Sequence, residues 1–332
     1  MAKYRDPYVC NLKLLLIFLV IFAHLLEPYI GADALARRLY QFIYSFHMPL
    51  FAFLSGLYFS SPESCLRQSL NAFKWYAIAQ LVPLLCGRLG PYSRAVQLFF
   101  LPYWHLWYLF SLGSWALIAA GTRTLQARFA GKRGASGRFP ACIFAAAVLI
   151  SLLAGLVPFL RRGLSLSRTL VFLPYVLLGM FAGKNIRPLA DQCRKRLPAL
   201  VPLAAILAFA VLRLVPPEFL WQATPYANGA LTGMSTRLLC LPAALAVGAL
   251  VLALTPRRKL PFSATGAETL WIYLLHAIPV KILWKLNPAG PFFIPLCLAQ
   301  ALALLALGGL LTRPLQKRYI LSDPRNHIRP DA

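Results

Sequence analysis

Ionisable side chains lie inside long apolar segments of this sequence. His47 sits in the run YSFHMPLFAFLSG, and Pro49 follows it by two residues. A second such histidine, His24, comes 11 residues after Lys13 and three residues before Glu27. On one helix these spacings place the lysine and the imidazole on the same face and bring the carboxylate within reach of the ring. Because the ordinary pKa of histidine suits proton transfer near neutral pH, both histidines are candidates for acid–base chemistry.

Few other ionisable groups occur in such apolar surroundings. Ionisable groups are costly within a membrane, so they tend to face the interior of a helix bundle and to mark function. His105 opens one apolar segment and is flanked by Trp104 and Trp107. The remaining members of this set are His276 and Glu268, and Arg168 and Arg237 are expected at the outer ends of helices. For any single histidine, a plain hydrogen bond to a neighbouring helix is the alternative role.

The hydropathy pattern predicts the elements that carry these residues. The chain has 332 residues, of which 59% are hydrophobic and 13% charged, with a mean hydropathy of +0.65. The apolar residues form blocks of about 15–22, close to the ~20 residues that a helix needs to cross a membrane. We therefore expect an all-α polytopic membrane protein, with a single membrane domain over 1–315 and a polar cytoplasmic tail over 316–332. About ten transmembrane helices are expected, near residues 12–30, 39–59, 72–86, 104–120, 139–160, 169–183, 197–216, 236–254, 267–286 and 291–312.

The distribution of charge predicts the topology. The 34 basic and 9 acidic residues give a formal net charge of +25. With the N-terminus inside, the predicted inner segments hold 22 of the 34 basic residues and the outer segments hold 11. This bias fits the positive-inside rule, so we expect a multi-pass protein of the cell (inner or plasma) membrane with both termini in the cytoplasm. The clusters at 194–196 and 257–259 suit anionic membrane lipid, with a polyanionic cytosolic ligand as the alternative, and nucleic acid is not an expected partner.

The seven cysteines lie mostly in or beside apolar segments and show no CxxC spacing. This pattern predicts neither a disulfide framework nor a metal site. No permanently bound cofactor is expected either.

The rise of a helix places the histidines at definite depths. At 1.5 Å per residue, His24 on the first helix and His47 on the antiparallel second helix both lie about 18 Å from the inner face. His276 is expected near the midplane, and His105 near the outer rim. Pro49 removes a backbone donor, so we expect the second helix to open or kink beside His47 and to expose carbonyls to a cavity. An ordinary proline kink is the alternative.

Four parts of the sequence resemble one protein family. They are NLKLLLIFLVIFAHLLEP, FIYSFHMPLFAFLSGLYFS, the pair YWHLWYLFSL and LSLSRTLVFLPYVLLGM, and TGAETLWIYLLHAIP. Together they resemble the integral-membrane acyltransferase 3 family, most closely its fucose 4-O-acetylase-like branch. In the opening helix of that family a basic residue precedes a histidine as Lys13 precedes His24 here. The likeness runs from about residue 6 to residue 312, which is essentially the whole chain.

The resemblance implies an O-acyltransferase that takes an acyl group, usually acetyl, from cytosolic acyl-CoA as co-substrate. It also implies that the group is delivered to a hydroxyl of a carbohydrate on the far side of the membrane, as in exopolysaccharide or lipopolysaccharide. Lys13 and His24 are implied to be essential, with His47 in the same site.

Acyl transfer to a hydroxyl needs a base and donors that stabilise the tetrahedral oxyanion, which suggests roles for the candidate residues. We expect His24 to act as the general base or to carry the acyl group, with Glu27 orienting it and His47 completing the catalytic set. The acyl-CoA would contact Lys13 and Arg168. The acceptor would contact His276, Trp104, His105 and Trp107.

Two other classes of function fit the same residues. One is a transporter or flippase for a sugar-linked substrate, in which the histidines relay protons. The other is a non-catalytic membrane partner in a polysaccharide assembly complex. Inverted repeats would favour the transporter, and none is recognised in the sequence.

Overall fold

A computed structural model describes most of the chain. The described residues are 3–85, 101–129, 135–160, 163–223, 225–226, 229–286, 292–316 and 319–321. Within them the regular secondary structure is helical apart from two strands of three residues, β1 (Lys3–Arg5) and β2 (Tyr319–Leu321), which pair in parallel. The predicted polar tail over 316–332 falls almost wholly outside the described residues.

The helices follow the predicted apolar segments. The α-helices are α1 (Pro7–Leu26), α2 (Ala34–Gly56), α3 (Pro62–Leu85), α5 (Trp107–Phe129), α6 (Ala135–Leu153), α7 (Leu166–Ala182), α8 (Arg187–Lys195), α9 (Leu197–Leu214), α10 (Ala230–Leu254), α11 (Thr269–Leu275), α12 (Ala277–Leu286), α13 (Phe293–Leu311) and α14 (Arg313–Gln316). The 3-10 helices are η1 (Glu27–Tyr29), η2 (Trp104–Leu106), η3 (Ala154–Leu156), η4 (Pro158–Leu160), η5 (Gly163–Ser165), η6 (Pro217–Trp221) and η7 (Ser263–Glu268).

The first two long helices begin at side-chain caps. The carboxylate of Asp6 accepts a hydrogen bond from the backbone N–H of Tyr8, and Pro7 occupies the first helical turn. Asp33 caps α2 in the same way by accepting from the N–H of Ala36. These aspartates satisfy donors that a helix start leaves unpaired.

All ten predicted segments overlap helices. Fewer than ten of these helices, however, are both long enough and apolar enough to be candidate membrane spans. Six helices in the described residues, α1, α6, α7, α9, α10 and α13, are long and apolar enough to cross a membrane. The bent pair of η7–α11 and α12 raises the number to seven if it counts as one span. Helices α2, α3 and α5 are also long, but their composition is less apolar and they are not among these six. The sequence reasoning missed α8, a short polar helix with basic residues in its last turn.

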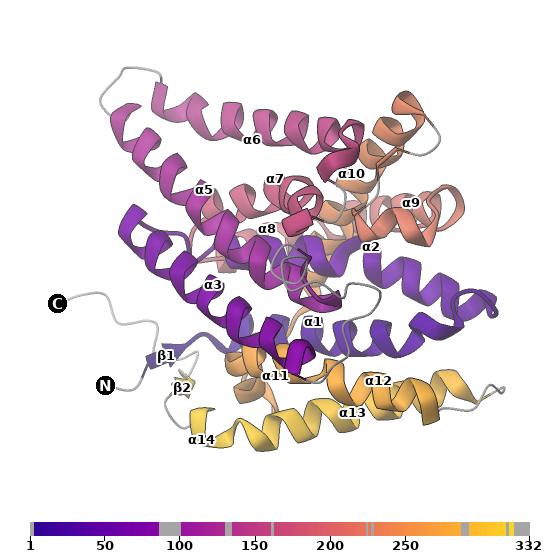
Figure 1. The fold of residues 1–332 in the computed structure, drawn as a ribbon. Helices are drawn as coiled ribbons and strands as arrows, with labels where there is room; N and C mark the ends of the chain where they lie inside the picture. Colours follow the sequence, from indigo (N-terminus) through magenta and orange to yellow (C-terminus); the bar gives the residue numbers. More distant parts are fainter. Residues whose placement is uncertain are drawn as a thin grey trace.

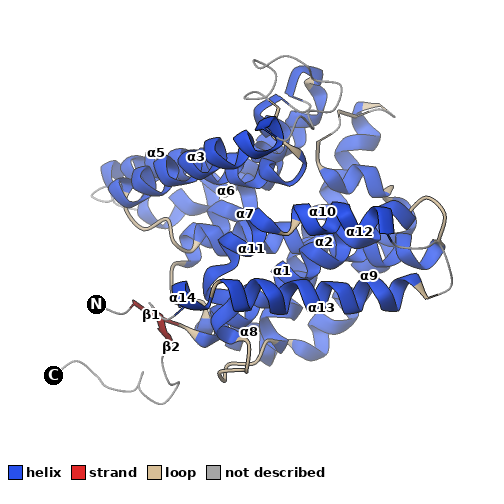
Figure 2. Ribbon diagram, turned by 60° about the horizontal axis from the view of Figure 1, so that its bottom comes forward, coloured by secondary structure: helices blue, strands red, loops and turns tan. Residues whose placement is uncertain are grey.

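Helix α1 lies inside the bundle, between α2 on one side and α12 and α13 on the other (Figure 1). Helix α2 packs in turn against α7 and α10, and α7 packs against α5 and α6. The turned view in Figure 2 shows α3 and α5 running side by side, in agreement with their contact. The two helices that carry His24 and His47 are therefore central and packed on several sides.

Glycine brings α2 and α7 into unusually close contact. A Cβ atom at Gly179 would overlap the carbonyl of Phe53, and a Cβ at Gly56 would overlap the carbonyl of Val176. Because only hydrogen occupies these positions, the two backbones lie against each other along this line. This contact fixes the position of the His47 helix relative to α7.

The ninth predicted helix, 267–286, is not continuous, which corrects the expectation. The helix breaks at His276, and the segments on either side of the break differ in direction by 61°. Pro279 follows three residues later and has no N–H to donate to the carbonyl of Leu275. At Pro49, by contrast, the chain does not separate into two helices, because α2 runs as one helix from Ala34 to Gly56.

Ion pairs tie α8 to the end of the bundle that carries β1 and β2. Arg187 makes two hydrogen bonds to the carboxylate of Asp6, of 2.8 and 3.0 Å. Arg257 pairs with Asp191, and this partner holds the pKa of the Asp191 carboxyl below its usual value. Both contacts connect distant parts of the chain at the entrance to α1.

Candidate active site

A cavity of about 240 Å³ lies between α1, α2, α5 and α11. It receives Lys13 and His24 from α1, His47 from α2, His105 from η2 and Trp107 from α5. Aromatic residues form much of the remaining wall, namely Tyr44, Phe51, Tyr58, Tyr108 and Tyr273. The cavity therefore brings together Lys13, His24 and His47, three residues that the sequence assigned to one site.

His47 is buried and is held by its own helix. Its Nδ1 lies 2.7 Å from the carbonyl oxygen of Ile43, one turn earlier. Since a carbonyl only accepts, Nδ1 carries the proton and donates it, which leaves the lone pair on Nε2. The edge of the Tyr44 ring packs on the imidazole, with centroids 4.8 Å apart. His47 thus presents a basic nitrogen from a fixed ring.

His24 stands at the last turn of α1, where three groups surround it. Its Nδ1 lies 3.4 Å from Oε2 of Glu27, an ion-pair distance, although the two atoms are not aligned as a hydrogen bond. The Trp104 ring lies over it with centroids 4.3 Å apart, and the His276 ring is 5.5 Å away. Trp104 has a positive φ of 31°, an unfavourable backbone conformation for an aromatic residue that places the indole on His24.

His105 and His276 join His24 in one group of rings. The centroids of His105 and His276 are 5.1 Å apart. Nδ1 of His276 donates to the carbonyl of Tyr273 at 2.7 Å, and its buried Nε2 has no hydrogen-bond partner among the described residues. His105 is buried, at 6% exposed, and lines the same cavity as His24. The segment before α5 turns inward because Tyr273 donates a hydrogen bond to the carbonyl of His105.

Lys13 occupies the part of the cavity away from His24. Eleven residues of helix separate the two by roughly 16 Å along α1. The ammonium group of Lys13 lies 5.0 Å from the centre of the Tyr58 ring, a cation–π distance. The cavity therefore extends along α1 from a cationic group to a pair of imidazoles.

Arg168 lies behind the cavity wall rather than in it. Its guanidinium is 4.9 Å from the centre of the Trp107 ring, and its Nε donates to the carbonyl of Trp221 at 2.9 Å. The Trp107 ring also stacks on Phe172, with centroids 5.5 Å apart. Trp107 reaches the cavity while its ring is packed between these two side chains. This arrangement therefore favours a supporting role for Arg168, which holds Trp107, over direct contact with a ligand.

The sequence reasoning did not select Lys281 as a site residue. The ammonium of Lys281 donates to the hydroxyl of Tyr103 and lies 5.2 Å from the centre of the Trp104 ring. The signal in the sequence that points to it is a lysine within the predicted ninth helix, 267–286. Lys281 thus adds a cation beside the ring that covers His24.

Metal chemistry finds no support in the described part of the chain. No group of three or more His, Cys, Asp and Glu residues there is arranged to hold a metal ion. The six cysteines among the described residues are all free thiols. Acid–base chemistry by imidazole is the chemistry that the arrangement offers.

Comparison with known proteins assigns a family but no individual relative. The profile of the acyltransferase 3 family, described as an acyltransferase domain, matches residues 6–312. No curated protein and no solved structure matches the chain. The matched range contains every residue of the cavity described above.

Proposed function

The chain belongs to the acyltransferase 3 family, and we propose that it is a membrane O-acyltransferase that moves an acetyl group from cytosolic acetyl-CoA to a hydroxyl of a cell-surface or exported carbohydrate. Membership of this family indicates acyltransferase activity, and the apolar helices indicate a multi-pass membrane protein. The acetyl donor, the carbohydrate acceptor and the likeness to fucose 4-O-acetylases are the finer part of the proposal.

One observation carries this proposal, which is the cavity shared by Lys13, His24 and His47. Its length along α1 suits a donor that enters at one end of the bundle and an acceptor that enters at the other. The ammonium of Lys13 suits the phosphates of CoA. The imidazoles lie where the thioester of such a donor would end.

The proposed reaction uses the histidines as bases. Nε2 of His47 or the ring of His24 takes the proton of the acceptor hydroxyl as its oxygen attacks the thioester carbonyl carbon. A tetrahedral oxyanion forms, the carbon–sulfur bond breaks, and the CoA thiolate leaves and takes up the proton. Oε2 of Glu27, 3.4 Å from Nδ1 of His24, lies where it can orient that imidazole. The apolar and aromatic wall protects the thioester from water.

The acceptor is proposed to lie at the His24 end of the cavity, where His24 and His105 line the wall and Trp104 and His276 pack against these two rings. Trp104, His105 and His276 form a contiguous aromatic group with His24. An indole face packs well on the C–H face of a sugar, and imidazole nitrogens bond hydroxyls. Trp107 also lines this cavity, and the guanidinium of Arg168 packs on its ring and holds it in place.

The proposed topology has ten spans and both termini in the cytoplasm. The support is the bias of basic residues toward one set of loops. Helices α2, α3 and α5 have 23, 24 and 23 residues, enough for a bilayer. Helices α2 and α5 pack against α7, which is one of the six apolar candidate spans, and α3 packs against α5. Lys13 then faces the cytosolic side, where acetyl-CoA is found.

The proposal is tested by mass spectrometry of surface glycans from cells with and without the gene. We expect an acetyl-sized mass difference that His24→Ala abolishes while the protein remains in the membrane. His327→Ala, which changes a histidine of the C-terminal tail, is the matched control and should keep acetylation. Unchanged glycan mass with altered glycan export would instead favour the transporter, and full acetylation in His24→Ala would refute the catalytic assignment.

A further inference from the structure

An arginine lies buried in the bundle without an acidic partner. Arg237, in the second turn of α10, is 4% exposed. No Asp or Glu of the described residues lies within ion-pair distance of its guanidinium. A buried charge without a counter-charge is costly, so its surroundings must compensate for it.

Part of the compensation comes from a backbone carbonyl and two aromatic rings. Nη1 of Arg237 donates to the carbonyl of Ser151 at 2.8 Å. The guanidinium lies 4.8 Å from the centre of the Tyr226 ring and 5.7 Å from that of Phe219. These contacts hold the arginine in place, but they are weaker than pairing with an anion.

Glycine residues fix the ring on which Arg237 rests. A Cβ at Gly155 or at Gly233 would overlap the Tyr226 ring, so the ring fills a slot between the two glycines. The Tyr226 hydroxyl also donates to the carbonyl of Leu152 at 2.6 Å. The guanidinium therefore has a defined position and leaves one face toward a cavity.

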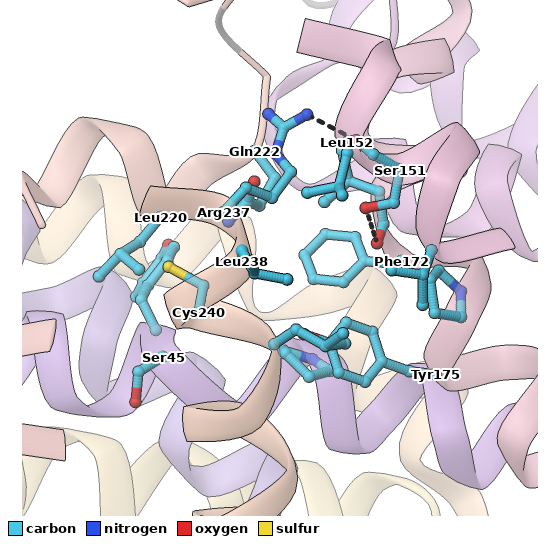
Figure 3. A pocket seen from close by; sticks show the side chains of 16 residues that line it. Ser45, Ser151, Leu152, Phe172, Tyr175, Leu220, Gln222, Arg237, Leu238 and Cys240 are labelled. Atoms are coloured by element: carbon cyan, nitrogen blue, oxygen red, sulfur yellow. Dashed lines mark hydrogen bonds between the residues drawn. The ribbon is translucent and has the colours of Figure 1, made fainter. Parts of the chain in front are cut away.

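Polar groups without partners line that cavity. Nε of Arg237 and Oε1 of Gln222 are both buried and make no hydrogen bond among the described residues. Both residues line a cavity of about 20 Å³, together with Ser151 and Tyr175. Figure 3 shows Gln222 beside Arg237 at one end of the cavity and Tyr175 at the other. No carboxylate lines it, and the phenol of Tyr175 and the nearby thiol of Cys240 carry no charge in their ordinary forms at neutral pH.

We propose that this cavity binds a small monovalent anion of the chloride class. The anion accepts from Nε–H of Arg237 and, with the side-chain amide turned end for end, from the NH₂ of Gln222. It supplies a counter-charge that no Asp or Glu of the described residues gives to Arg237. A volume of about 20 Å³ admits one ion of this size and excludes an organic anion such as gluconate.

The anion site lies directly behind the histidine cavity. Tyr44 and Pro49 line the anion cavity, and Tyr44 also lines the histidine cavity and packs on His47. An anion beside Arg237 therefore braces the part of α2 that carries His47. The inference needs only binding to this cavity and does not rest on the proposed acyl transfer.

Thermal unfolding of the purified protein in sodium chloride, sodium bromide and sodium gluconate, at equal ionic strength, tests the proposal. The Tm of the wild type is expected to rise with chloride or bromide in a saturable manner, on the order of 3 °C above its value in gluconate. Gln222→Glu supplies a carboxylate beside Arg237. This variant is expected to lose the chloride dependence and to match, in gluconate, the Tm of the chloride-bound wild type.

Gln126→Glu is the matched control, because Gln126 accepts a hydrogen bond from Arg123 at 2.9 Å on another helix. General salt effects act on both variants alike, so this control is expected to keep the full chloride dependence. Arg237→Gln, where it folds, is expected to show none. The same wild-type Tm in all three salts, as for a cavity that holds only water, would overturn the proposal. Full chloride dependence in Gln222→Glu would overturn it as well.

Discussion

Two histidines precede prolines in this protein, and their helices behave differently. Pro49 follows His47 by two residues, and α2 runs unbroken through both. Pro279 follows His276 by three residues, and the chain bends by 61° at the histidine. Proline removes a hydrogen bond in both places, so proline alone does not decide whether a helix breaks.

The packing of each helix explains the difference. Helix α2 is enclosed by α1, α7 and α10, and Gly179 allows α7 to lie directly on its backbone. The bent pair has one open side, where Leu275, Ile278 and Ile282 are each at least half exposed. An enclosed helix cannot bend without displacing its neighbours, whereas a helix with an open side can. Buried packing thus keeps one histidine rigid, and the break turns the other toward His24.

The largest predicted effect distinguishes the two histidines by chemistry. His47→Gln removes a base that lines the cavity, so we expect the rate of acyl transfer to fall by about 10²–10⁴-fold. His276→Gln should lower the rate less, because we assign that ring to binding the acceptor. Steady-state kinetics in purified protein measures both. Equal losses of kcat in the two variants would contradict the assignment of His47 as a base and of His276 as a residue that binds the acceptor.

The second prediction concerns the close contact between α2 and α7. Gly179→Ala places a methyl group against the carbonyl of Phe53, and overpacking of this kind costs about 1–3 kcal/mol. Gly121→Ala is the control, because a Cβ there meets nothing within 4 Å. Thermal unfolding should show a lower Tm for the first variant only. A Tm unchanged by Gly179→Ala would mean that the α2–α7 contact does not constrain the helix.

The third prediction concerns the break between α11 and α12. Pro279→Ala restores an N–H that can donate to the carbonyl of Leu275 and favours a straighter α11–α12. His276 then moves relative to His24, and a rate loss of about tenfold is expected from such a displacement. Pro49→Ala should change the rate less, because α2 is already continuous. If Pro49→Ala proved the more harmful, the comparison between the two helices would be reversed.

The smallest predicted effect concerns the attachment of α12 to α1. The indole N–H of Trp284 donates to the carbonyl of His24 at 2.8 Å. Trp284→Phe removes this hydrogen bond, which contributes about 0.5–1.5 kcal/mol, and keeps an aromatic ring. Chemical or thermal unfolding should detect a small loss of stability with the rate largely retained. A rate loss as large as that of His47→Gln would place Trp284 in the catalytic chemistry.

Residue spacing and hydropathy in the sequence predicted the positions of most helices and the candidate site residues on α1 and α2. The spacing of Lys13, His24 and Glu27 along one helix was enough to predict that they share a face, and antiparallel depth was enough to place His47 near them. The contact of η2 with α11 lies beyond such local patterns, because the hydrogen bond from Tyr273 to the carbonyl of His105 connects residues 168 positions apart. The continuity of α2 and the role of Gly179 depend on which helices become neighbours, and hydropathy does not specify that. The functions of the site residues remain predictions to be tested.

The central claim is that one cavity connects a donor on one side of the membrane with an acceptor on the other. The protein reconstituted in sealed vesicles, with labelled acetyl-CoA only on the side of Lys13 and glycan only on the opposite side, tests it directly. We predict labelled acetyl ester on the glycan, with CoA remaining on its own side, and loss of the label in His24→Ala. Glycan labelled only when donor and acceptor share one side, or no labelling with folded wild-type protein, would contradict the account.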